Sequence, residues 1–117
     1  RDRYGVAVTP DRLLLTCGAS PALVLALSSR FQPGDRIAMA RPGYVAYRNV
    51  VKGLNMQAVE IACGPAEHYQ LTAAALEALD PAPAGVIVAS PANPTGSVIA
   101  EAELARIAEV CRRRGIQ

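Results

Sequence analysis

The chain has 117 residues, a formal net charge of +2 at pH 7, and 51% hydrophobic residues. This length supports one modest domain with one core, and the hydrophobic content excludes an intrinsically disordered chain. The net charge is too small to indicate a nucleic-acid partner. The uncharged stretch from Leu13 to Ser29 is interrupted by Gly18 and Pro21 and is shorter than a membrane span, so we expect no membrane partner either.

The first expected strand, 13–17, leads through a glycine turn into a helix expected over 21–30, with Ser20 as a favourable N-cap. A glycine turn that feeds a helix N-terminus exposes free backbone N–H groups toward one point, which is a common phosphate site. Gly18, Ala19 and Ser20 are therefore candidate anion-binding residues. Many strand-to-helix turns have the same composition and bind nothing, so the turn alone leaves both interpretations open.

Two further expected strands also end in residues suited to a ligand. The strand 36–40 is followed closely by Tyr44, which is either a ring that contacts a ligand or a core aromatic. The strand 85–90 runs into a loop with two prolines, in which Asn93 carries a donor and an acceptor on a short side chain. Ordinary turn formers would also explain that loop. Ligands bind at the carboxyl ends of the strands in open α/β sheets, which favours a site here.

The remaining elements complete a regular alternation. A strand is expected over 56–62, and helices are expected over 44–52, 73–79 and 101–114. Helices that separate apolar strands predict an α/β fold with a parallel sheet and right-handed crossovers.

Helix ends carry recognisable signals. Thr72 is the expected N-cap of the third helix, and Gly53 is the expected C′ residue of the second. Arg112, Arg113 and Arg114 lie in the last turn of the final helix, where we expect them to complement the helix dipole in solvent rather than bind an anion. The apolar face of that helix is expected to consist of Leu104, Ile107, Ala108 and Cys111.

The cysteines indicate neither a metal site nor a disulfide framework. Cys17, Cys63 and Cys111 lie far apart in the sequence, and His68 is the only histidine, so we expect no metal site. We expect Cys17 to be a small buried residue and His68 to face solvent. An odd number of scattered cysteines and no visible secretion signal predict a cytoplasmic protein.

Three successive strand ends thus offer a phosphate cradle, an aromatic ring and an amide. This order resembles the large domain of fold type I pyridoxal-phosphate enzymes, specifically the class I/II aminotransferases. The resemblance extends from about Val8 to the end of the chain. The matching segments are, in chain order, Thr16–Leu23, Phe31–Arg36, Pro42–Asn49 and Ala89–Gly96.

The resemblance implies a three-layer α/β/α fold with a mainly parallel sheet, and pyridoxal 5′-phosphate (PLP) as the cofactor. It implies that the backbone N–H groups of Ala19 and Ser20, after the Gly18 turn, hold the cofactor phosphate. Tyr44 would stack on the pyridine ring, and Asn93 would donate to the phenolic oxygen of the cofactor. Members of the family often have cis peptide bonds at the positions that match Arg41-Pro42 and Asn93-Pro94.

The resemblance also implies that residues 1–117 are a partial PLP-binding large domain. The family's Schiff-base lysine, its acid for the pyridine nitrogen and its arginine for the substrate carboxylate are expected beyond Gln117, and Arg1–Gly5 looks like the tail of a helix. The only lysine is Lys52, which we expect to be exposed. We therefore expect this chain to hold no catalytic residue and to be inactive when isolated.

The complete enzyme would be a homodimer that moves an amino group between an amino acid and a 2-oxo acid. Three alternatives remain: a PLP-dependent β-eliminating lyase, the aminotransferase-like domain of a transcription regulator, and a Rossmann-like nucleotide-binding module. The last lacks a G-x-G-x-x-G motif after the first strand. It would also pair 13–17 with 36–40. The family topology instead implies that 36–40 lies between 56–62 and 85–90 and that 13–17 has no neighbour in this chain.

Overall fold

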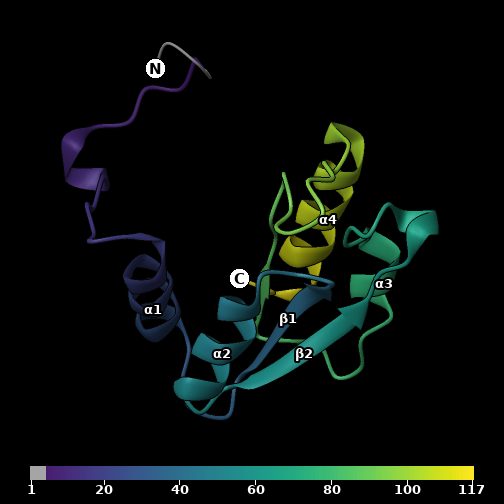
Figure 1. The fold of residues 1–117 in the computed structure, drawn as a ribbon, viewed down its shortest axis with the longest axis horizontal. Helices are drawn as coiled ribbons and strands as arrows, with labels where there is room; N and C mark the ends of the chain where they lie inside the picture. The colour runs from purple at the N-terminus through teal and green to yellow at the C-terminus, as the bar shows by residue number, and fades with distance from the viewer. Residues whose placement is uncertain (1–4) are drawn as a thin grey trace.

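The computed structural model describes residues 5–117, so the helix tail expected at Arg1–Gly5 lies almost entirely outside the described residues. Helices and strands alternate along the chain (Figure 1). In chain order the elements are η1 (Pro10–Arg12), α1 (Ala19–Arg30), β1 (Arg36–Arg41), α2 (Val45–Gly53), β2 (Gln57–Ala62), η2 (Pro65–Glu67), α3 (Ala73–Glu77), β3 (Gly85–Ile87) and α4 (Glu101–Arg114), where η marks a short 3₁₀ helix.

The three strands form one parallel sheet in the order β2-β1-β3. Ile37 of β1 is aligned with Ala58 on one side and with Gly85 on the other. Phe31 packs directly against Gly85, so only glycine fits at this position. An added Cβ would lie 2.3 Å from Phe31 Cζ. The predicted strand order is confirmed, and β1 is the centre of the sheet.

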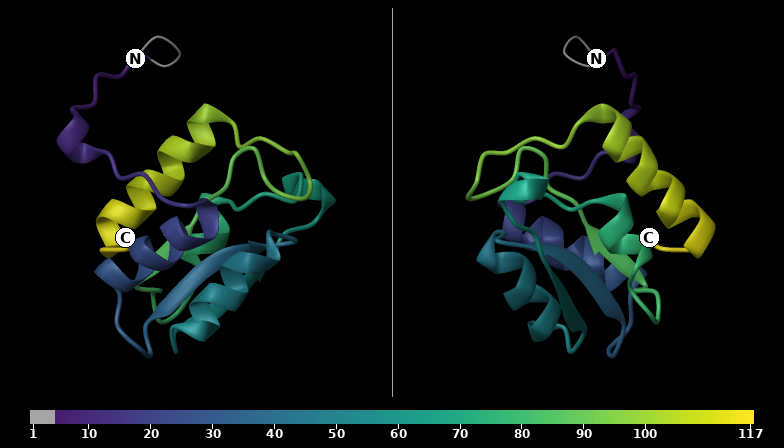
Figure 2. Two further views of the ribbon diagram at one scale, coloured as in Figure 1. Left: turned by 60° about the vertical axis from the view of Figure 1, so that its left-hand side comes forward. Right: turned by 90° about the vertical axis from the view of Figure 1, so that its right-hand side faces the viewer.

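Helices cover both faces of the sheet (Figure 2). Side chains alternate across a strand, so Ile37 and Met39 pack on the side of α1 and α2, whereas Ala38 packs on the side of α3 and α4. Ile37 and Ala38 are fully buried. Full burial of a side chain the size of Ile37 stabilises the fold by about 1.5–3 kcal/mol. The three-layer α/β/α architecture with a parallel sheet is therefore confirmed.

The segment 13–17 is not a strand, which corrects the first strand prediction. Leu14 and Leu15 are 77% and 97% exposed, and Cys17 is exposed rather than buried. Figure 1 shows the chain before α1 extending away from the sheet. A strand is stable only when neighbouring strands take up its N–H and C=O groups, and no strand in the described part of the chain pairs with 13–17.

The ends of two helices differ from the expectation. α1 begins at Ala19 with Gly18 at the N-cap, so Ser20 lies inside the first turn and caps nothing. Gly18 has φ 122°, which a residue with a side chain rarely adopts. After α2, the left-handed residue is Asn55 with φ 58°, whereas Gly53 remains helical. Asn tolerates this conformation better than most residues, which is why it can replace the glycine.

Other boundaries are close to those expected. α4 has the predicted bounds, and Thr72 caps α3, since its Oγ1 accepts a hydrogen bond from Ala75 N at 3.1 Å. α3 and β3 are shorter than predicted. They end at Glu77 and Ile87.

The buried face of α4 was predicted only in part. Ile107 is buried, as expected, but its buried partner is Val110. Leu104 and Ala108 are exposed. Both apolar stripes satisfy helical spacing, so the position of α3 and the sheet decides which one is covered.

Arg113 and Arg114 do more than complement the dipole of their own helix. Arg114 donates to the backbone oxygens of Leu76, Glu77 and Leu79 at 3.0, 2.8 and 2.8 Å, and Arg113 pairs with the Glu77 carboxylate. The last carbonyls of α3 have no partners within their own helix. The end of α4 therefore supplies the cap for the end of α3.

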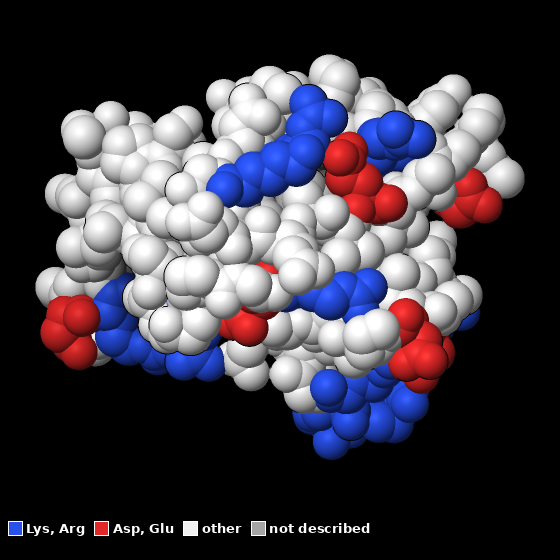
Figure 3. Space-filling model, turned by 90° about the horizontal axis from the view of Figure 1, so that it is seen from below, with Lys and Arg blue, Asp and Glu red and all other residues white. Residues whose placement is uncertain are grey.

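The surface charges are mixed in sign. On the face seen from below, basic and acidic side chains are interspersed (Figure 3). Within residues 5–117, no helix has both the length and the apolar character needed to cross a membrane.

Candidate functional site

The turn after β1 presents Tyr44 at the carboxyl edge of the sheet. A Cβ at Gly43 would lie 2.6 Å from Ala40 O, so only glycine fits this turn without displacement of the backbone. Tyr44 follows as the N-cap residue of α2, with extended dihedral angles of φ −63° and ψ 121°. The turn thus places Tyr44 just beyond the strand end, before the helix carries the chain back.

Tyr44 is not a core residue, because 39% of it is exposed. Its ring packs edge to face against Tyr47, with a centroid distance of 5.5 Å and an interplanar angle of 88°. Edge-to-face packing is a favourable aromatic geometry, and it orients the Tyr44 ring while part of that ring stays accessible.

The loop after β3 is closed by its own hydrogen bonds. Ala92 N donates to Ser97 O at 2.9 Å, and Gly96 N donates to Ala92 O at 2.7 Å. Ser90 Oγ accepts a hydrogen bond from Ile99 N at 3.0 Å. We call the segment Ser90–Gly96 the asparagine loop, because it carries Asn93. The peptide bonds Arg41-Pro42 and Asn93-Pro94 are cis, as predicted.

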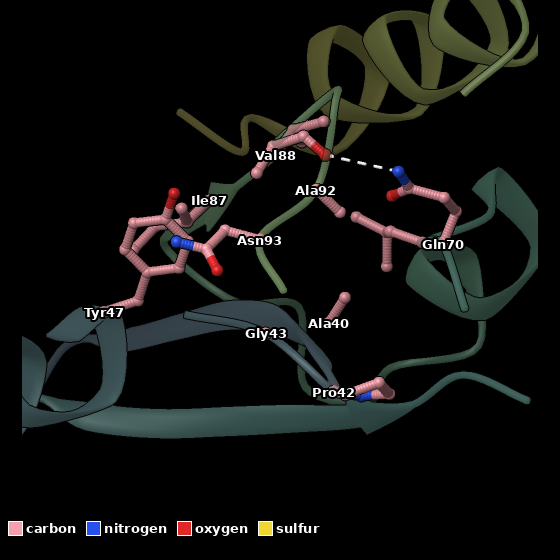
Figure 4. A pocket seen from close by; sticks show the side chains of 11 residues that line it. Ala40, Pro42, Gly43, Tyr47, Gln70, Ile87, Val88, Ala92 and Asn93 are labelled. Atoms are coloured by element: carbon pink, nitrogen blue, oxygen red, sulfur yellow. Dashed lines mark hydrogen bonds between the residues drawn. The ribbon is translucent and has the colours of Figure 1, made fainter. Parts of the chain in front are cut away.

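Asn93 lies next to the turn after β1. It lines a cavity of about 20 Å³ together with Pro42, Gly43, Tyr47 and other residues, and Figure 4 shows its side chain beside the Tyr47 ring. Asn93 is exposed, and within the part of the chain that the structure describes its side-chain amide makes no hydrogen bond. The amide is therefore free to bind a ligand.

A second cavity, of about 140 Å³, lies beside Tyr44 on the same turn after β1. It is lined by Tyr44 and shares Ala40, Pro42, Gly43 and Tyr47 with the first cavity. Two side chains that are 49 positions apart in the sequence, Tyr44 and Asn93, thus lie on either side of one turn.

Gly18, Ala19 and Ser20 lie at the N-terminus of α1, and all three are exposed. Thr16 Oγ1 donates to Gly18 O at 2.8 Å, which fixes the turn that enters the helix. The first N–H groups of a helix have no intrahelical partner, so they are available to an anion. α1 runs opposite to β1, which turns this N-terminus toward the carboxyl end of the sheet (Figure 1). Ala19 and Ser20 line neither of the two cavities.

Two residues of the site were missed by sequence reasoning, Tyr47 and Gln70. Tyr47 lies three residues after Tyr44, and this spacing on a helix was a usable signal for a shared face. Gln70 lines the first cavity and is buried, and nothing around it in the sequence distinguishes it from a surface glutamine.

The reactive side chains of the chain lie outside the site. Lys52 and His68 are exposed, as predicted. Burial raises the pKa of the Cys63 thiol, and the thiol donates to Ile61 O at 3.3 Å, so this cysteine is held neutral and is a poor nucleophile. Among residues 5–117, no group of histidine, cysteine and acidic side chains is arranged to hold a metal ion.

The family model for aminotransferase class I and II matches residues 1–117. The chain therefore belongs to this family, whose members use PLP. It is 50% identical over 109 residues to the valine–pyruvate aminotransferase of Mycobacterium tuberculosis, an alignment that covers 93% of this chain and 28% of that protein. The chain thus spans less than a third of the length of this relative.

Solved structures agree with this assignment. The crystal structure of an aminotransferase from Mycobacterium tuberculosis superposes with a TM-score of 0.95 at 48% identity, over 98% of this chain and 30% of that one. Cystalysin from Treponema denticola, which contains PLP, has a TM-score of 0.88 over 99% of this chain and 30% of that one; at 24% identity it shows the same fold. The strand order and the unpaired segment 13–17 do not favour the Rossmann-like alternative.

The side chains at the site fit part of PLP. Tyr44 offers an accessible aromatic ring, Asn93 offers a free amide, and the N-terminus of α1 offers N–H groups to an anion. No lysine lines either cavity, because the chain's only lysine, Lys52, is exposed at the end of α2. The arrangement can hold a ring and a negatively charged oxygen. It offers no amine for a covalent bond to an aldehyde.

Proposed function

We propose that this chain is a segment of a PLP-dependent aminotransferase that moves an amino group between an amino acid and a 2-oxo acid. The observation that carries the proposal is the placement of Tyr44 and Asn93 on either side of the Pro42-Gly43 turn, in a chain of the aminotransferase class I and II family. When bound, PLP supplies an electron sink for the reaction. The chain's own residues bind and orient it.

Each predicted site residue has one role in this proposal. Tyr44 stacks on the pyridine ring, a contact worth about 1 kcal/mol beyond the area it buries. Asn93 donates from its amide to the phenolic oxygen, and a donor to an ionised oxygen favours the ionised form. Ala19 and Ser20, after the Gly18 turn, hold the phosphate through backbone N–H groups and the Ser20 hydroxyl.

In this proposal residues 1–117 form a partial PLP-binding large domain, and this chain contributes no catalytic residue. The lysine, the acid for the pyridine nitrogen and the arginine for the substrate carboxylate are contributed by other parts of a longer, cytoplasmic, homodimeric enzyme. The isolated chain is then inactive. Treatment with PLP and borohydride, followed by peptide mass spectrometry, tests this: one stoichiometric cofactor adduct on Lys52 together with turnover would contradict the proposal.

The function is tested in the complete protein. Absorbance spectroscopy after dialysis reports bound PLP, and valine with pyruvate is the first substrate pair to assay, because the relative with 50% identity carries that name. We expect bound cofactor and transfer of the amino group. A purified protein that retains no PLP would contradict the proposal.

The role of Asn93 is tested by Asn93→Ala. Loss of the amide donor disfavours the ionised phenolic oxygen, so the pH midpoint of the bound cofactor's absorbance band should rise. Asn49→Ala is the matched control, because Asn49 is an exposed residue of α2 that lines neither cavity. An unchanged pH midpoint in Asn93→Ala would show that Asn93 does not donate to the phenolic oxygen of the cofactor.

A further inference from the structure

Gln70 is the one buried polar side chain among residues 5–117, with 6% of it exposed. Its Nε2 lies 2.6 Å from Ser97 O and 3.4 Å from Ala89 O. Figure 4 shows Gln70 on the opposite side of the first cavity from Tyr47, and the dashed line marks the hydrogen bond from its amide to Ala89 O. The two acceptors come immediately before and immediately after the asparagine loop.

The chemistry of the two acceptors fixes the orientation of the Gln70 amide. Both are carbonyl oxygens, so they can face only the NH₂ end, which has two hydrogens to donate. The bond to Ser97 O is short and the bond to Ala89 O is long, which makes the first the stronger. Ser97 O also accepts from Ala92 N inside the loop, so both of its lone pairs are used.

The backbone on both sides of Gln70 is held in place by hydrogen bonds and by burial. Gln70 N donates to Glu67 O at 2.9 Å, and the Glu67 carboxylate accepts from Gly64 N at 3.0 Å, which closes the preceding turn. The next residue, Leu71, is 1% exposed and belongs to the core under α3 and α4. The backbone that carries the amide is thus held in place independently of the asparagine loop.

We propose that Gln70 is a positioning residue that clamps both ends of the asparagine loop and thereby sets the place of the Asn93 amide at the cofactor. A single amide group bridges the two chain segments that flank Asn93, and the residue that carries it is followed by Leu71, which is 1% exposed. The link to the cofactor rests on the proposed function. The clamp on the loop is a property of the protein without cofactor.

The first test measures how strongly the backbone amides of the asparagine loop are protected from hydrogen exchange in the complete, cofactor-free protein. Gln70→Met keeps the length of the side chain and removes both donors. Hydrogen exchange of the backbone amides in 90–97, expressed as protection factors, should show at least a tenfold loss, while amides in β1 keep their protection. Gln57→Met makes the same chemical change at an exposed position of β2 and should leave the loop unchanged. Equal protection in Gln70→Met and the wild type would overturn the proposal.

Gln70→Glu adds a test that does not depend on the fold tolerating methionine. At neutral pH the introduced carboxylate would face two carbonyl oxygens with no hydrogen to donate, so the loop should lose protection. Protonation at about pH 5 restores one donor, because burial and two facing oxygens raise the pKa of this carboxyl. Protection should then return toward the wild-type value, whereas Gln70→Met should show no such recovery. The same protection at both pH values would contradict the clamp.

The second test asks whether the hydrogen bonds from Gln70 to the loop affect the bound cofactor. In the complete protein loaded with PLP, Gln70→Met should raise the pH midpoint of the cofactor's absorbance band in the same direction as Asn93→Ala, and by less. A loosened loop with an unchanged midpoint would overturn the positioning role. If the wild-type protein binds no PLP, the proposed function fails, and the hydrogen-exchange results still decide whether Gln70 clamps the loop.

Discussion

At the scale of single residues, the site combines side chains that the sequence identifies with one that it does not. Tyr44 and Asn93 were identified from the sequence because a ring and an amide just after apolar strands are informative by residue type alone. Gln70 was not, because its significance lies in burial and in two carbonyl partners that are 19 and 27 residues away. Nothing in a local sequence window reports such partners.

Gly43→Ala should destabilise the complete protein by about 1–3 kcal/mol, the usual cost of forcing extra volume into a packed site. The added Cβ would lie 2.6 Å from Ala40 O, and this backbone atom cannot move away without distorting β1. Urea unfolding measures the change. Gly53→Ala is the control, since Gly53 is helical with no atom within 4 Å of an added Cβ, and it should be stabilising by about 0.5–1 kcal/mol. Equal effects of the two substitutions would contradict the steric argument.

At the scale of elements, contacts between helices decide what helix propensity leaves open. α3 has only five residues, Ala73–Glu77, and an isolated helix of this length is not stable. Its N-terminus is capped by Thr72, and its last carbonyls are capped by Arg114 of α4. The basic run at the end of α4 therefore stabilises two helices.

Arg114→Ala should cost about 1.5–3 kcal/mol, because three charge-assisted bonds are lost and, of the three carbonyls, only Leu76 O keeps another bond, from Leu79 N at 3.3 Å. Thermal or urea unfolding measures the loss. Arg112→Ala is the matched control: its pair with Glu109 is on the surface, with the arginine side chain 76% exposed, so it should cost no more than about 0.5 kcal/mol. A cost for Arg114→Ala as small as that of the control would show that the cap contributes nothing.

The ion pair between α3 and α4 should depend on pH. The hydrogen bond from Arg113 lowers the pKa of Glu77, so the pair stabilises the fold above the ordinary glutamate pKa and is lost as the pH falls through the lowered pKa. The stability difference between the wild type and Glu77→Gln should therefore be present at pH 7, begin to fall near the ordinary glutamate pKa of about 4.3, and disappear below the lowered pKa. Unfolding curves across this range measure it, and a difference that persists at pH 2 would assign the effect to something other than the charge.

At the scale of the whole molecule, the described chain leaves apolar surface uncovered at one end. Leu13, Leu14 and Leu15 are 63%, 77% and 97% exposed, and the segment that carries them extends away from the sheet (Figure 1). At the other edge of β3, the backbone of Gln117 makes two hydrogen bonds in the pattern of a parallel strand pair. Gln117 N donates to Ala84 O, and Gln117 O accepts from Val86 N, both at 3.0 Å. Exposed apolar residues in a row favour association.

The isolated chain should therefore self-associate. Sedimentation velocity at increasing concentration should show oligomers or larger species, and a variant with both Leu14→Ser and Leu15→Ser should associate less. Val98→Ser is the control, because Val98 is 65% exposed and belongs to the connection between β3 and α4 rather than to the segment before α1. A monomer at all concentrations, with or without the substitutions, would contradict the expectation.

The sequence by itself determined the alternation of helices and strands, the strand order that follows from the family resemblance, and the candidate residues at the strand ends. These properties are local or follow from motif order: hydrophobic periodicity, capping residues such as Thr72, and the loop around Asn93. Only the tertiary structure decided that 13–17 is not a strand, that α4 buries Val110 instead of Leu104, and that Gln70 and Arg114 bind distant carbonyls. The physical reason is that pairing, burial and hydrogen bonding depend on partners far along the chain, which residue types alone do not specify.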